Sequence, residues 1–121
     1  MIATNREEVK QAIGLHGLWK ARLLAAVTTG QCHYRAEQVG KSEGCEFGRW
    51  LAGIPRDAVD ASYAEKARVL HQRFHVEAAQ VLRLVESGER EAASRAIEPG
   101  SGFARSTAEL TLTLLEWSKA A

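Results

Sequence analysis

The stretch VLHQRFHVEA, residues Val69–Ala78, decides the fold because its apolar residues and its two histidines recur at helical spacing. The same spacing continues in both directions and predicts one long helix from about Asp57 to Glu86, capped by Asp57 and ended at Ser87 and Gly88. Steps of mostly three and four connect its apolar positions Tyr63, Ala67, Leu70, Phe74, Val81 and Val85. A helix with one apolar stripe needs partners to cover it, so this stretch predicts a bundle of helices.

A second long helix is predicted at the start of the chain. Thr4 or Asn5 can cap it, and Thr28, Thr29 and Gly30 end it. Helical spacing connects its apolar positions Val9, Ala12, Ile13, Leu15, Trp19, Leu23, Ala26 and Val27. His16 falls on this apolar stripe, one turn before Trp19.

The segment that follows is less regular. Residues 31–44 predict a loop with one turn of helix near Arg35–Val39. The sequence CEFGRWLAG, Cys45–Gly53, predicts a short helix or tight turn that carries Phe47, Trp50 and Leu51 inward.

The end of the chain predicts one helix in two pieces. Helical patterns cover Glu89–Ile97 and Phe103–Lys119, and PGSG at Pro99–Gly102 breaks the chain between them. No stretch alternates in the manner of a strand. The sequence therefore predicts an all-α fold: an antiparallel four-helix bundle with a short extra helix at Cys45 and a kinked or broken fourth helix, in a single domain of residues 1–121.

The composition excludes several classes of partner. Hydrophobic residues make up 45% of the 121 residues, which is ordinary for a globular protein, and the formal charge is only +1. Nucleic acids and anionic membranes attract basic surfaces, so neither is expected as a partner. The N-terminus lacks the features of a signal peptide, and no apolar run is long enough to span a membrane. We therefore expect a cytoplasmic protein whose two cysteines are free thiols or metal ligands.

Four residues offer a possible metal site. His71 and His75 lie one helical turn apart and can aim two ring nitrogens at one point, while His16 and Cys45 lie on two other elements. A closed zinc site takes four such ligands. The spacing alone leaves a second reading open, in which these histidines are hydrogen-bonded core residues and Cys45 is a small buried hydrophobe.

The motifs AIGLHGLWKARL, CEFGRWLAG and LHQRFHVEAAQVLRLVESGEREAA together resemble the chemoreceptor zinc-binding domain, a bacterial family abbreviated CZB. The family pattern is a histidine three residues before an aromatic, then C-x-F/L-G-x-W, then H-x-x-x-H. The resemblance covers about Ala12 to Trp117 and implies that His16, Cys45, His71 and His75 bind one zinc ion within a four-helix bundle.

The resemblance also implies a non-enzymatic function. Members of the family are often homodimers, are usually fused to a chemoreceptor or a diguanylate cyclase, and report zinc or oxidants such as hypochlorous acid. Two departures stand out. Lys41, Ser42 and Glu43 replace the acidic residue and histidine that many relatives have before the cysteine, and the chain carries no output domain. It is therefore expected to be a free-standing or an excised version.

Other metal chemistry fits the residues less well. HQRFH has Gln72 where a metalloprotease helix needs a glutamate base. A di-iron site needs carboxylates on inner faces, and the predicted inner faces carry none. A haem would need the space that Trp19, Phe74 and Trp117 are expected to fill. A purely structural zinc remains the main rival to a sensory one.

A sensory role would depend on Cys45. Zinc holds a cysteine sulfur as the thiolate, which oxidants attack. We expect oxidation to release zinc and to loosen Cys45–Gly53 before the long helix unfolds, with Gly44 and Gly48 either as hinges or merely as turn and packing residues. Cys32 and His33 are expected to be exposed in the loop. Leu112 and Leu115 widen the apolar surface of the last helix and predict self-association.

Overall fold

The computed structural model describes residues 2–31, 34–41 and 45–120, with side chains from Arg6 onward in the first helix. In these described residues six helices follow one another: α1 (Ile2–Thr29), α2 (Ala36–Val39), α3 (Glu46–Ala52), α4 (Ala61–Glu86), α5 (Arg90–Arg95) and α6 (Gly102–Ala120). The described part of the chain contains no strand. The predicted all-α fold is confirmed.

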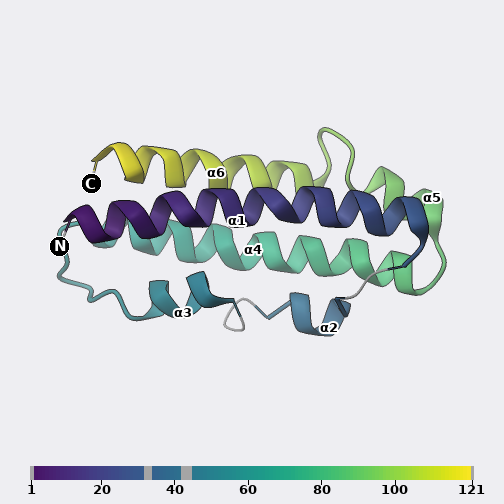
Figure 1. Cartoon of the computed structure of the whole chain (residues 1–121), viewed down its shortest axis with the longest axis horizontal. Coiled ribbons are helices and arrows are strands. Elements are labelled where there is room, and N and C mark those ends of the chain that lie inside the picture. Colours follow the sequence, from purple (N-terminus) through teal and green to yellow (C-terminus); the bar gives the residue numbers. More distant parts are fainter. Residues whose placement is uncertain (1, 32–33, 42–44, 121) are drawn as a thin grey trace.

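The helices form four columns that alternate in direction (Figure 1). The first column is α1 and the third is α4; the second consists of α2 and α3, one after the other, and the fourth consists of α5 and α6. Both chain ends lie at the same end of the bundle, beside α3. The short helix after Cys45 and the break in the last column both match the sequence prediction.

Two helix starts differ from the prediction. Helix α1 begins at Ile2, before the predicted caps Thr4 and Asn5. Helix α4 begins at Ala61 and not at Asp57, because residues 56–60 form turns. Asp60 precedes the helix but makes no capping hydrogen bond; its carboxylate accepts a hydrogen bond from the indole of Trp117 at 2.9 Å.

Side chains of α1, α4 and α6 build the core along most of the bundle. The predicted inward positions Ala67, Leu70, Phe74, Val81 and Val85 of α4 are all buried. Leu15 of α1 is the exception among the predicted stripe, since it is 37% exposed and borders a groove beside Cys45.

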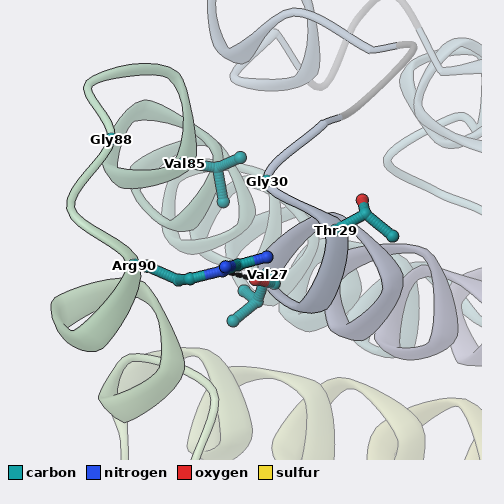
Figure 2. Close-up of a pocket in the computed structure, with 6 residues that line it drawn as sticks. All are labelled: Val27, Thr29, Gly30, Val85, Gly88 and Arg90. Atoms are coloured by element: carbon teal, nitrogen blue, oxygen red, sulfur yellow. Dashed lines mark hydrogen bonds between the residues drawn. The ribbon is translucent and has the colours of Figure 1, made fainter.

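The end of the bundle away from the chain termini is closed by turns and by an arginine. Gly30 and Gly88 have positive φ angles of 77° and 78°, which glycine adopts without strain and which end α1 and α4. Arg90 of α5 donates a hydrogen bond to the carbonyl of Val27 at 3.2 Å (Figure 2). It donates another to the carbonyl of Thr28, also in the last turn of α1. The guanidinium thus caps the negative end of the α1 dipole and lines a small pocket of about 220 Å³.

Among the residues that the structure describes, no helix is long and apolar enough to cross a membrane.

Candidate metal centre

Four potential ligand atoms converge inside the bundle. One nitrogen from each of His16, His71 and His75 and the sulfur of Cys45 all lie within 4.8 Å of one another. His16 comes from α1, Cys45 directly precedes α3, and the histidine pair comes from α4. The structure therefore brings together every residue that the sequence suggested as a ligand. It is the one such group of histidine, cysteine and carboxylate side chains found among the described residues.

Backbone carbonyls fix the orientation of two imidazole rings. Nδ1 of His16 lies 2.8 Å from the carbonyl oxygen of Ala12, and Nδ1 of His75 lies 2.8 Å from that of Val39. A carbonyl can only accept, so both Nδ1 atoms carry the proton and donate. Each ring then presents the lone pair of Nε2 to the cluster, which is the tautomer that a metal needs.

The inner nitrogens fit a metal better than they fit a network of hydrogen bonds. Nε2 of His16 is buried without any hydrogen-bond partner, and Nε2 of His71 lies 3.0 Å from Nε2 of His75. Tetrahedral zinc with bonds of about 2.0–2.1 Å separates its nitrogen ligands by roughly 3.3 Å. The 3.0 Å separation and the 4.8 Å limit of the cluster bracket that value. A zinc ion would also satisfy the orphaned nitrogen of His16, so the residues present fit the metal.

The rings of His16 and His71 are neutral at ordinary pH. Burial lowers the pKa of His16 to about 4; the hydrogen bond to Ala12 opposes this effect and the nearby His75 adds to it. Burial also lowers the pKa of His71 to about 3, with further lowering from His75 and His16. A neutral imidazole is the form that binds metal, so no proton has to leave these two rings before a metal can bind.

Aromatic rings enclose the histidines. The ring centroid of His16 lies 5.5 Å from that of Phe47 and 5.1 Å from that of Phe74, both in edge-to-face contact. The sequence predicted Phe47 and Phe74 only as core residues. The carbonyls of Ala12 and Val39 gave no sequence signal, because any residue type carries the same backbone acceptor.

Access to the cluster is one-sided. His16 and His71 are only 2% and 1% exposed, whereas Cys45 is half-buried. Cys45 and His75 line a groove of about 530 Å³ that is also bordered by Trp19, Tyr34 and Lys41. A small solute can therefore reach the cluster from the side of the cysteine. Cys32, His33 and Gly44 lie outside the described residues, and Gly48 lies within α3.

Di-iron chemistry finds no support in this group. The cluster consists of three histidines and one cysteine, without a carboxylate to bridge two irons. Three imidazoles and one thiolate are a zinc donor set, and four protein ligands leave tetrahedral zinc without an open position for water or substrate.

Comparison with protein families agrees with this donor set. The model of the chemoreceptor zinc-binding domain matches residues 16–82, which begin at His16 and include all four residues of the cluster. Comparisons with curated proteins and with solved structures find no significant match.

Proposed function

Because the chain belongs to the chemoreceptor zinc-binding domain family, we propose that it is a regulatory domain that holds one zinc ion through His16, Cys45, His71 and His75. The observation that carries the proposal is the convergence of the four ligand atoms from three separate elements. Bound zinc would keep the Cys45 sulfur deprotonated and would connect α1, the start of α3 and α4. The proposed role is sensing and not catalysis.

The signal that we propose is oxidation of Cys45. A thiolate attacks hypochlorous acid at chlorine, and water then replaces chloride on sulfur; the net reaction converts RS⁻ and HOCl into RSOH and Cl⁻. Sulfur loses two electrons and chlorine gains them. The sulfenic acid is a poorer zinc ligand than the thiolate, so zinc would be released. The half-buried position of Cys45 beside an open groove supports access for so small an oxidant.

We further propose that the domain acts as a homodimer that passes its signal to a chemoreceptor or diguanylate cyclase partner. One exposed apolar face supports the homodimer. Leu112 of α6 is 60% exposed and Val69 of α4 is 50% exposed. An ion pair between Arg73 of α4 and Glu109 of α6, at 3.8 Å, lies one helical turn from Val69 and from Leu112, so these two apolar residues are on the same side of the bundle. The output partner rests on family membership alone.

Metal analysis of the purified protein tests the zinc site. We expect one zinc per chain and no visible absorption of the kind that haem or di-iron gives. Cys45→Ala should lower zinc affinity sharply, because it removes the one anionic ligand, whereas His33→Ala should leave affinity unchanged. Zinc retained at full affinity in Cys45→Ala would refute the assignment.

Oxidant titration separates a sensory zinc from a structural one. The test uses Cys32→Ser, so that Cys45 is the remaining thiol. We expect about one equivalent of hypochlorous acid to release the zinc, because one two-electron oxidation converts one thiolate to sulfenic acid. A colorimetric chelator measures the zinc that is released. Zinc that stays bound after Cys45 has been oxidised would support the structural reading instead.

A further inference from the structure

Helix α3 is anchored to α4 at its C-terminal end. The guanidinium of Arg68 donates to the carbonyl of Leu51 from Nη2 (2.7 Å) and Nε (3.2 Å), and to the carbonyl of Ile54 from Nη2 (3.1 Å). Glu65 accepts a hydrogen bond from the same guanidinium at 2.7 Å and so orients it. The anchor does not involve the metal cluster. The end of α3 near Gly53 therefore stays attached to α4 when the cluster changes.

The other end of α3 is attached through the cluster. Cys45 is the residue directly before the helix, and its carbonyl accepts the hydrogen bond from Arg49 that opens the helix (3.1 Å). With zinc bound, the sulfur of Cys45 would fix this end in place. Without that bond, α3 keeps the Arg68 anchor at one end and loses its covalent tether to the metal at the other.

Stacked rings lie between these two ends and lead away from the cluster. Phe47 contacts the rings of His16 and His71, with centroids 5.5 Å and 5.3 Å away. Phe47 stacks on Trp50 at 5.6 Å and 25°, and Trp50 stacks on Trp117 at 5.6 Å and 30°. This series of ring contacts thus runs from the imidazoles through α3 to the last turns of α6.

The receiving residue, Trp117, is fully buried and contacts residues at and just before the start of α4. Its indole donates to Asp60 at 2.9 Å and its ring stacks on Tyr63 at 6.3 Å. The next residue, Ser118, accepts a hydrogen bond at its carbonyl from Nε of Arg6 in α1 (3.0 Å). A displacement of Trp117 therefore acts on the point where α1 starts and α6 ends (Figure 1).

We propose that α3 is a lever, held at Arg68, that transmits the ligation state of Cys45 to Trp117 through the Trp50–Trp117 stack. The inference rests on the proposed zinc function. When Cys45 is released, α3 tilts about its Arg68 anchor, which displaces Phe47 and turns the Trp50 ring that stacks on it. Trp117 then changes its packing, because it loses one of its two ring partners. In this proposal the cysteine end of α3 moves and the end near Gly53 stays attached, whereas the sequence led us to expect loosening of all of Cys45–Gly53.

The indole N–H groups of this chain, labelled with ¹⁵N, report this motion directly. The chain has three tryptophans, so three indole signals can be followed while zinc is added to the metal-free protein. We expect the Trp117 signal to shift and to saturate at one zinc per chain. In Trp50→Leu, zinc should still bind at one per chain while the shift of Trp117 is lost. The matched control is Trp19→Leu, which leaves the ring series intact and should preserve the shift.

The outcomes separate the lever from the metal site. A Trp117 signal that stays unmoved while one zinc binds, or a full shift in Trp50→Leu, would overturn the lever and leave the zinc site standing. No zinc binding to the unmodified protein would overturn the proposed function, and the lever with it. If Trp50→Leu does not fold, Arg68→Gln gives a second test. It keeps all four ligands but frees the anchor, so the Trp117 shift should shrink at unchanged zinc stoichiometry; an undiminished shift would refute the anchor.

Discussion

Replacing His16 by phenylalanine should raise the stability of the metal-free protein and lower that of the zinc-bound protein. The ring of His16 is 2% exposed and its Nε2 has no hydrogen-bond partner. A buried polar atom left without a partner costs about 1–3 kcal/mol. His16→Phe removes this cost and places an apolar ring between Phe47 and Phe74, which already contact it edge to face.

In the metal-free state, the stabilising interactions that His16→Phe loses are smaller than this gain. The hydrogen bond from Nδ1 to the carbonyl of Ala12 disappears, at about 1 kcal/mol, but that carbonyl belongs to the same helix and keeps its place in the backbone ladder. The larger ring adds some strain in a packed site. The net change without metal is therefore a gain of about 1 kcal/mol in the free energy of unfolding.

With zinc bound, the wild type should be more stable than His16→Phe, which reverses the order expected without metal. Free zinc at a hundred times its Kd stabilises the wild type by about 2.7 kcal/mol, whereas His16→Phe has lost one of the four ligands. With zinc, the variant should therefore be less stable than the wild type by about 2 kcal/mol. Urea unfolding followed by circular dichroism, with a chelator and with zinc, measures both differences.

His75→Phe is the matched control, since it removes a ligand in the same way. Its Nδ1 donates to the carbonyl of Val39 in α2, so the substitution breaks a bond between two elements and leaves a buried carbonyl without this donor. We expect it to lose about 1–3 kcal/mol even in chelator. Equal losses for His16→Phe and His75→Phe in chelator would refute the reasoning about the orphaned nitrogen.

Two further predictions concern pH and association. The pKa of His16 is lowered to about 4 and that of His71 to about 3, both from 6.5, so their stabilising contribution is complete above pH 6.5 and is lost as the pH falls toward 4. Urea unfolding of the metal-free protein should therefore give a free energy about 4 kcal/mol lower at pH 5 than at pH 7, at roughly 2 kcal/mol for each ring, and equal values would contradict burial of neutral rings. In sedimentation velocity at high micromolar concentration, the zinc-loaded protein should be a dimer and Leu112→Lys should be a monomer. The control Val59→Lys changes a residue that is 92% exposed in a turn, and it should remain dimeric. A monomeric wild type would exclude the homodimer.

The sequence predicted the columns of the bundle better than their starting points. Spacing of apolar residues fixes which face of α4 is buried, and Phe74, Val81 and Val85 are indeed in the core. The start of α4 was predicted at Asp57 because an aspartate before a helical pattern is a common cap. In the fold, Asp60 lies nearer to the helix, and its carboxylate binds the indole of Trp117, 57 positions away. Local sequence carries no information about so distant a partner.

The metal centre, too, was predictable from sequence in part only. The residue types and the i, i+4 spacing of His71 and His75 suggested the four ligands, and the structure brings their atoms together. Which ring nitrogen faces the cluster depends on the carbonyls of Ala12 and Val39, and these contacts exist only after the helices have packed. The Arg68 anchor of α3 was not predicted for a similar reason, because its acceptors are backbone carbonyls of Leu51 and Ile54.

The division of the second column into α2 and α3 has a consequence for folding. Helices of four and seven residues are too short to persist alone in water, because nucleating a helix costs more than so few hydrogen bonds return. Helices α1 and α4 have 28 and 26 residues and can associate first. They carry His16, His71 and His75, so zinc can bind these imidazoles before Cys45 arrives, and the ring of His75 is fixed only when α2 brings the carbonyl of Val39 to it. Zinc held by those three rings would then recruit the thiol, and the metal would act as the template on which the second column assembles.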